Sequence, residues 1–245
     1  MRSRSLLEQY KSAILALPQD GDLNKQELLT DAFRMAAEGR ITMYYAPHNE
    51  WINHAARVVI VGITPGWTQM KTAFQTARAG LAEGLPNEEI CRRAKREAGF
   101  AGSMRHHLIL MLDRLGLPGY LNVGSSAALF REQAQLLHTT SLLRYPVFVD
   151  GDRNYTGSSP DIQASPLLCR QALSALEELQ EIPGSMLIPL GRAVERSLLW
   201  MVDQGQIQEE RILKGFPHPS GANGHRQRQF AENEESMRAM LTKYF

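Results

Sequence analysis

The stretch Arg57-Val-Val-Ile-Val-Gly-Ile-Thr-Pro-Gly-Trp67 says most about how this chain folds. Its first half is a β-branched run without polar alternation, which is typical of a strand covered on both faces in a parallel sheet. The glycines and the proline of its second half predict a turn, because glycine permits close backbone approach and proline fixes one shape. We therefore predict a central strand over residues 57–63 and a turn over residues 62–67.

Strands and helices alternate along the rest of the chain. Ser165 is a helix cap with Pro166 in the first position, and Gly191 opens another helix over residues 192–202. The predicted fold is an α/β three-layer sandwich with a short, mainly parallel four-stranded sheet flanked by helices. The further strands are predicted at 139–143, 185–190 and, from a weaker pattern, 211–216; residues 69–115 are predicted to be mostly helical, with breaks at 84–86 and 99–102.

The first 50 residues are expected to form an amino-terminal helical layer. Apolar residues three and four positions apart predict two amphipathic helices there, over residues 5–17 and 23–37. Residues 144–164 are rich in Gly, Asp and Ser, which predicts a hairpin or long loop inserted in the scaffold. With 245 residues, of which 43% are hydrophobic and 22% charged, the chain is expected to form a single domain over residues 1–245.

The composition narrows the class of protein. A formal net charge of +1 gives no overall attraction to a polyanion, so any nucleic-acid contact has to come from a local basic patch. No apolar run is long enough to span a bilayer, and the amino terminus does not resemble an export signal. Cys91 and Cys169 are too few for a disulfide framework or a four-thiolate cluster. We therefore expect a soluble, cytoplasmic protein that does not bind membranes.

Two turns are predicted to lie beyond the carboxyl ends of the strands, where open parallel sheets bind ligands. One is residues 62–67, and the other is the stretch Gly215-Phe-Pro-His-Pro-Ser-Gly-Ala-Asn-Gly-His-Arg226. A histidine, a hydroxyl and a backbone that glycines allow to approach closely are expected to form a binding pocket for a flat polar ring. Residues 62–67 lack the Lys-Ser/Thr of a phosphate loop and the third glycine of a dinucleotide fingerprint, so neither ligand class is indicated. An ordinary strand-to-helix turn is the alternative for this stretch.

Five landmarks in order along the chain resemble those of the uracil-DNA glycosylase superfamily. Residues 62–66 are similar to its first motif, Gly-x-(Asp/Asn/Ala)-Pro-(Tyr/Gly), and His218-Pro219-Ser220 matches its closing motif residue for residue. Within the same closing landmark, His225-Arg226 falls where the most widespread uracil-excising family also has His-Arg. The other landmarks are the loop 99–102 with Phe100, the strand 140–144 with Ser141, and the strand and glycine at 187–191. The resemblance covers residues 57–226 and implies the superfamily's α/β fold.

This resemblance implies a DNA glycosylase, which hydrolyses the N-glycosidic bond of uracil or another deaminated or modified base after flipping the base out of the stack. His218 would hydrogen-bond the ring carbonyl on which negative charge grows, a role worth on the order of 10²- to 10³-fold in rate. Thr64 would place the attacking water. Base contacts are expected from Gly62, Ile63, Pro65, Gly66, Ser141 and the stacking Phe100, and DNA contacts from Ser220, Gly221, Ala222, Asn223, His225 and Arg226.

Four departures from the superfamily pattern modify this expectation. Thr64 replaces the usual Asp or Asn, and a threonine hydroxyl can orient water but cannot act as a general base near neutral pH. Ser141 replaces an Asn that reads the base edge, which favours a base other than uracil. Gly66 replaces the bulky Tyr that excludes thymine, which favours larger or modified bases. Ala222 replaces the apolar wedge that fills the duplex, which favours single-stranded DNA.

Other groups are weaker candidates for chemistry. Asp150, Asp152 and Asp161 are the nearest carboxylates for a missing base, although Asp-Gly and Gly-Asp are ordinary turn chemistry. His106 and His107 are adjacent, so on a helix their rings point about 100° apart and cannot form an i, i+4 metal-ligand pair. We expect one of these two histidines to be buried and the other exposed.

Two basic segments are candidates for phosphate contacts. Arg92, Arg93, Lys95 and Arg96 have Glu88, Glu89 and Glu97 beside them, which favours a solvated helix face over a phosphate contact. Arg226 and Arg228 are better phosphate candidates because they lie next to the matched loop.

The preferred hypothesis is a monomeric DNA glycosylase that uses no cofactor and no metal and has DNA as its partner. The alternative is a non-catalytic module on the same scaffold that binds an unpaired or modified nucleotide, which the identities of Thr64, Ser141 and Ala222 support. A small-molecule nucleoside hydrolase is a third hypothesis, because a weak wedge and near-zero net charge also suit a free nucleoside.

Overall fold

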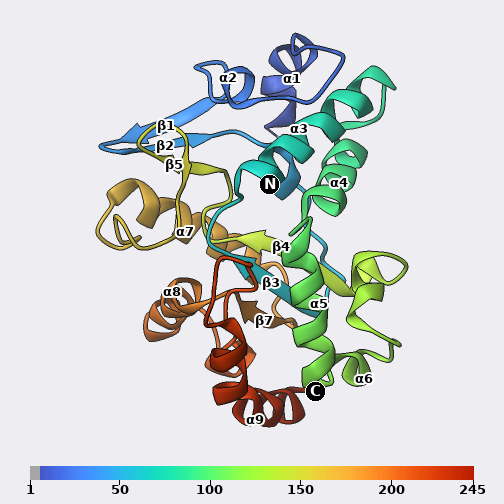
Figure 1. The fold of residues 1–245 in the computed structure, drawn as a ribbon, viewed down its shortest axis with the longest axis vertical. Helices are drawn as coiled ribbons and strands as arrows, with labels where there is room; N and C mark the ends of the chain where they lie inside the picture. Colours follow the sequence, from blue (N-terminus) through green and yellow to red (C-terminus); the bar gives the residue numbers. More distant parts are fainter. Residues whose placement is uncertain (1–5) are drawn as a thin grey trace. The chain divides into compact units, whose positions relative to one another are not determined.

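The computed structural model describes residues 6–245, which divide into two compact units, each assembled from separate stretches of the chain (Figure 1). The first unit contains the residues up to Ile52, Thr64–Ala101 and Leu143–Ser159. The second unit contains Asn53–Ile63, Gly102–Leu142 and Pro160–Phe245. The single-domain interpretation stays a prediction. Within residues 6–245, no helix combines the length and the apolar character that a bilayer crossing requires.

A parallel sheet forms the centre of the second unit. Its strands are β3 (Val58–Gly62), β4 (Leu137–Ser141) and β7 (Met186–Pro189), in the order β4-β3-β7. Every residue of β3 is buried, as expected of a β-branched strand that has neighbours on both edges and helices on both faces. The three strands predicted at 57–63, 139–143 and 185–190 are therefore confirmed, and so is the α/β class.

The predicted fourth strand at 211–216 is wrong. Only Ile212 forms a bridge, parallel to Leu187 of β7. Gly215 then adopts a left-handed backbone with φ of 85°, and Pro217 has no N–H to donate to a ladder. The chain consequently turns away after one bridge, and the parallel sheet has three strands instead of four.

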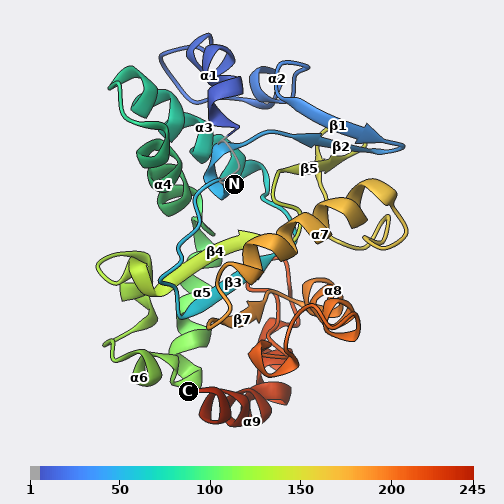
Figure 2. The ribbon, with the colours of Figure 1, turned by 180° about the vertical axis from the view of Figure 1, so that it is seen from behind.

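Helices cover both faces of this sheet. Figure 1 shows α5 (Ser103–Leu115) in front of the strands, and Figure 2, seen from behind, shows α7 (Pro166–Gln180) in front of them. The side chain of Ser165 accepts a hydrogen bond from the backbone N–H of Leu168, which confirms the predicted cap of α7. The remaining helices of this unit are α6 (Leu117–Leu121), α8 (Arg192–Asp203) and α9 (Arg226–Tyr244), with short 3₁₀ segments η2 (Ser126–Phe130), η3 (Ala134–Leu136) and η4 (Glu209–Arg211).

The first unit combines an antiparallel sheet with helices. Its strands are β1 (Arg34–Glu38), β2 (Ile41–Tyr44), β5 (Val147–Val149) and β6 (Arg153–Asn154), in the order β1-β2-β5-β6. The pairing of β5 with β6 confirms the hairpin predicted within residues 144–164. Helix α1 (Leu7–Leu15) and the pair α3 (Trp67–Ala82) and α4 (Asn87–Ala98) agree with the predicted helical stretches, and the 3₁₀ segment η1 (Pro47–Asn49) follows β2.

The helix predicted over residues 23–37 is wrong. Helix α2 extends only over Lys25–Leu28, where Asn24 and Glu27 form a capping box. Residues Arg34–Glu38 instead form β1, which pairs with β2 around a turn at Gly39, whose φ is 56°. Strand pairing with β2 therefore outweighs the helical spacing of the apolar residues. The predicted helical layer over residues 1–50 is a mixture of helix and strand in its described part, residues 6–50.

Candidate functional site

The carboxyl end of the parallel sheet brings several predicted site residues together in the second unit. Gly62, at the end of β3, is paired with Ser141 at the end of β4. On the other edge of β3, the backbone N–H of Leu190 donates to the carbonyl of Val61 (2.9 Å). The N–H of the next residue, Gly191, donates to the carbonyl of Phe216 (3.0 Å), which brings the chain that precedes His218 to the same end of the sheet.

Gly191 lets His218 lie directly against the backbone. An ideal Cβ atom at Gly191 would be 3.1 Å from the Cβ atom of His218, closer than ordinary van der Waals contact. Gly191 also has φ of 87°, a conformation that other residues adopt only with strain. Gly191, which was predicted to follow a sheet strand, is thus needed for two reasons: its positive φ and the close approach of His218.

His218 is held as a neutral ring with a defined tautomer. Burial lowers the pKa of its imidazole below the ordinary value, which favours the uncharged form near neutral pH. The backbone N–H of Ser220 donates to Nδ1 of His218 (3.2 Å), so Nδ1 is the unprotonated nitrogen. The ring proton is therefore assigned to Nε2, and His218 can present an N–H donor to a ligand.

Hydrogen bonds fix the backbone of residues 218–226, which we call the closing loop. The side-chain amide of Asn223 donates to the carbonyl of His218 (3.2 Å), and the guanidinium of Arg226 donates to the carbonyl of Ser220 (2.8 Å). The hydroxyl of Ser220 accepts from the N–H of Ala222 (3.2 Å) and keeps its own proton to donate. Asn223 and Arg226 thus shape this loop, while Gly221, Ala222 and His225 are exposed.

Helix α5 adds a further tether to the closing loop. Nδ1 of His107 lies 3.0 Å from the carbonyl oxygen of Pro219, and since a carbonyl only accepts, His107 is the donor. His107 is half-buried and His106 is exposed, close to the expected division of one buried and one exposed histidine. The sequence assigned no role to His107.

Ser141 is buried, with 4% of its surface exposed, and its position is fixed by the pairing with Gly62. The predicted contact between its hydroxyl and the edge of a base stays a prediction.

Thr64 has a structural hydroxyl in the first unit. The hydroxyl donates to the carbonyl of Tyr145 (2.9 Å) and accepts from the backbone N–H of Val147 (3.0 Å). Thr64 is 9% exposed. These two bonds use the only proton of its hydroxyl and one of the two acceptor positions. In the structure the residue joins the start of α3 to the chain that leads into β5, and the role of placing water stays a prediction.

The other predicted base contacts of the first unit are Pro65, Gly66 and Phe100. Gly66 caps α3, and its N–H donates to the side chain of Gln69 (3.1 Å). Phe100 is buried and has φ of 52°, a backbone conformation that costs energy in a non-glycine residue and is enriched at functional sites. Ile63, which belongs to the second unit, is half-buried. The stacking role of Phe100 stays a prediction.

Comparison with known proteins places the chain in a family. No family model matches it. The uncharacterized protein YoxB of Bacillus subtilis (strain 168) is 45% identical to it over 244 residues, which cover 99% of this chain and 94% of YoxB. The chain belongs to the YoxB family. Identity at this level over nearly the whole of both chains means that the YoxB family shares the fold described above.

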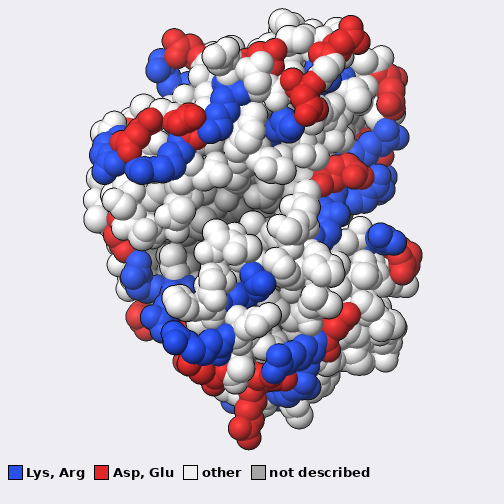
Figure 3. Space-filling model, in the orientation of Figure 1, with Lys and Arg blue, Asp and Glu red and all other residues white. Residues whose placement is uncertain are grey.

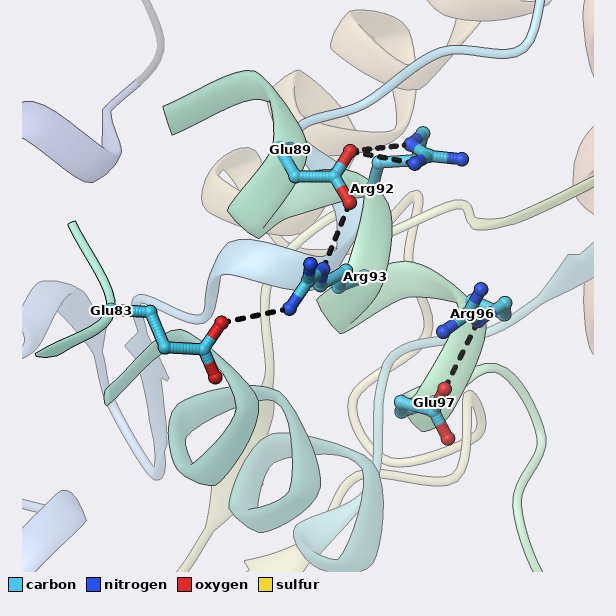
Figure 4. Close-up of polar contacts among 6 residues, drawn as sticks. All are labelled: Glu83, Glu89, Arg92, Arg93, Arg96 and Glu97. Atoms are coloured by element: carbon cyan, nitrogen blue, oxygen red, sulfur yellow. Dashed lines mark hydrogen bonds and ion pairs between the residues drawn. The ribbon is translucent and has the colours of Figure 1, made fainter. Parts of the chain in front are cut away.

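The basic segment of α4 in this YoxB-family chain is paired internally (Figure 4). Arg92 and Arg93 both contact Glu89 (2.7 and 2.8 Å), and Arg93 also reaches Glu83 (3.1 Å). Arg96 contacts Glu97 (3.0 Å). The two arginines hold the pKa of Glu89 below its ordinary value through these hydrogen bonds. The predicted solvated face is therefore confirmed for Arg92, Arg93 and Arg96, whose charges are neutralised by neighbouring carboxylates, and it is wrong for Lys95, which is buried.

The three carboxylates considered as a missing base are each in an ion pair. Asp150 contacts Arg40 (2.5 Å) and Arg153 (2.7 Å), and its pKa is lowered mainly by the hydrogen bond from Arg40. Asp152 contacts Lys25 (2.9 Å), and Asp161 contacts Arg196 (2.5 Å). A carboxylate whose ionised form is stabilised in this way is a weak base, so Asp150 is not suited to activate water. Asp152 and Asp161 are each paired with a cation.

Charges of both signs are interspersed on the surface of this YoxB-family chain. Figure 3 shows Lys and Arg side chains over the region of α8 and the start of α9, with Asp and Glu side chains beside them. No group of three or more His, Cys, Asp or Glu residues within 6–245 has a metal-binding arrangement. Because charges of both signs are interspersed and the net charge is only +1, any attraction to phosphate has to come from a local group of basic side chains.

Sequence reasoning missed the parts that His107 and Gly191 play in this YoxB-family chain. His107 is one of two adjacent histidines, and no spacing distinguishes it from His106. Gly191 was noted as a helix-opening glycine, but its contact with His218 depends on a loop that lies 27 positions further along the chain. Only the folded structure brings these residues together.

Proposed function

We propose that this protein is a DNA glycosylase that hydrolyses the N-glycosidic bond of uracil or another deaminated or modified base. The observation that carries the proposal is the neutral His218, which presents its Nε2–H donor where the strands bearing Gly62 and Ser141 end. The likeness of residues 57–226 to the uracil-DNA glycosylase superfamily supports it. Its fold class and parallel sheet are also compatible with such an enzyme.

In this reaction, water attacks the sugar carbon that carries the base, the N-glycosidic bond breaks, and the base leaves with the bonding electrons. His218 would donate its Nε2–H to the ring carbonyl on which negative charge accumulates, as oxyanion donors do. The attacking water would give its proton to solvent, because a threonine hydroxyl such as that of Thr64 cannot act as a general base, and Asp150 and Asp161 are each paired with an arginine. The leaving base would take up a proton from solvent after release.

The flanking contacts follow from the closing loop. The hydroxyl of Ser220 and the exposed backbone of Gly221 would bind phosphates next to the flipped nucleotide. Arg226 donates one guanidinium N–H to the carbonyl of Ser220, and its other N–H groups would donate to the same phosphates. Ala222 is exposed and small, so it offers no wedge to replace a flipped base in a duplex. The substrate that fits this loop is single-stranded DNA bound by a cytoplasmic monomer.

A second candidate function is a module that binds an unpaired or modified nucleotide without cutting it. The hydrogen bonds of Thr64 favour this candidate, since the residue aligned with the water-holding position is committed to Tyr145 and Val147. Both candidates use His218 as a donor to the base, and formation of an abasic site distinguishes them.

The test is alkali-revealed strand cleavage of labelled single- and double-stranded oligonucleotides that carry uracil, hypoxanthine, xanthine or hydroxymethyluracil. We expect cleavage at one of these bases, with a loss of about 10²-fold or more in His218→Ala. His218→Gln, which keeps an N–H donor, should retain part of the activity, and His106→Ala should match the wild type because His106 is exposed on α5.

Equal cleavage by wild type and His218→Ala would refute the proposed role of His218. Binding of the modified strand without cleavage at high protein concentration would establish the second candidate and reject the enzyme.

A further inference from the structure

Each backbone carbonyl of His218-Pro219-Ser220 accepts a hydrogen bond from a side chain. The donors are Asn223 for His218 and Arg226 for Ser220, both of which belong to the closing loop itself. The donor for Pro219 is His107, which belongs to α5. Bonds within a loop fix its shape, whereas a bond from a rigid helix also fixes where the loop lies.

We propose that His107 is a positioning residue that holds His218 at the carboxyl end of the parallel sheet. Pro219 directly follows His218, so a tether on its carbonyl limits movement of the imidazole. Gly191 also lies against His218, since a Cβ atom built on Gly191 would be 3.1 Å from the Cβ atom of His218. His218 is thus set between the backbone that follows β7 and a loop tethered to α5.

The tautomer of His107 agrees with this role. Nδ1 must carry a proton to donate to a carbonyl, and it carries one both in the Nδ1–H neutral ring and in the protonated ring. Asparagine can replace His107, because the side-chain amide nitrogen is the same number of bonds from the backbone as Nδ1 of histidine.

The kinetic part of the test rests on the proposed function. His107→Leu should lower the rate constant for base excision by about 10- to 100-fold, the loss expected when a catalytic group is misplaced by about 1 Å. The effect should fall on kcat more than on KM, because His218 acts in the transition state. His107→Asn should restore most of the rate, and His106→Leu, the same change on the exposed neighbour, should have no effect.

A second measurement does not depend on catalysis. The ring nitrogens of His218 can be followed by NMR during a pH titration, with their signals assigned by their loss in His218→Gln. In the wild type and in His107→Asn the pKa should stay below its ordinary value, as burial requires. In His107→Leu we expect the pKa to rise and the Nδ1 signal to change as the loop loosens.

The outcomes separate the two proposals. Unchanged His218 signals in a folded His107→Leu variant would overturn the positioning role, whether or not the wild type cuts DNA. If the signals change but the wild type excises no base, the tether is supported and the glycosylase proposal fails. If His107→Asn loses activity as fully as His107→Leu, the hydrogen bond is not what matters and the inference is rejected.

Discussion

His48 makes the stability of the first unit depend on pH. It lies in η1, fully buried, and within the described chain neither of its ring nitrogens has a hydrogen-bond partner. Burial, with a smaller contribution from the nearby positive charge of Lys95, lowers the pKa of His48 from 6.5 to about 3. The folded protein therefore keeps His48 neutral at pH values where the unfolded chain takes up a proton.

The sign and size of the effect follow from this difference. Between pH 6.5 and pH 3 the unfolded state binds the proton and the folded state does not, so acidification favours unfolding. One group changes the free energy of unfolding by at most about 1.4 kcal/mol per pH unit, which gives a loss of about 2 kcal/mol at pH 5. The full loss, reached near pH 3, is about 5 kcal/mol, and stability is unaffected by this group well above pH 6.5.

The assay is urea unfolding at pH 7 and pH 5 for the wild type and His48→Leu, which removes the titrating group without leaving a buried polar atom unpaired. We expect the wild type to lose about 2 kcal/mol more than the variant over this interval. His106→Leu should behave like the wild type, since His106 is exposed. Equal losses in the wild type and His48→Leu would refute the reasoning.

Two other predictions concern residues near the candidate site. Thr64→Val should lower the free energy of unfolding by about 1–3 kcal/mol, because the N–H of Val147 and the carbonyl of Tyr145 lose their partner. Chemical denaturation measures this loss, and Thr68→Val, at an exposed position of α3, is the control. A loss in Thr64→Val no larger than that in Thr68→Val would contradict the prediction. Gly191→Ala should lower base excision by about 10-fold or more by displacing His218. Gly205→Ala is its control, since Gly205 also has positive φ but has open space around it, and equal activity of the two variants would contradict the positioning argument.

Local patterns predicted much of the fold of this protein. The β-branched run of β3, the serine and proline that start α7, and the glycines between α3, α4 and α5 each act over a few residues, so the sequence displays them directly. The errors lie where distant pairing decides. Residues 34–38 have helical spacing but form a strand because β2 pairs with them, and residues 211–216 lose their strand because Gly215 turns the chain.

The sequence could name candidate site residues, but it could not indicate their protonation or their hydrogen-bond partners. The motif identified His218. The tautomer of His218 depends on the backbone N–H of Ser220, and its location depends on His107 and Gly191. Thr64 was matched to a water-holding position by alignment alone. Its true partners, Tyr145 and Val147, are about 80 residues away in the chain, and no local pattern indicates them.

The interleaving of the two units constrains how the chain can fold during synthesis. The first unit lacks its last stretch until Ser159 has been made, and β3 waits for β7, whose residues come far later than its own. The nascent chain therefore carries the apolar strand Val58–Gly62 without its partner β4 until residue 141 has been made, and without its partner β7 until residue 189 has been made. Neither unit can be produced by simple truncation, and the high sequence separation of the paired strands favours slow folding.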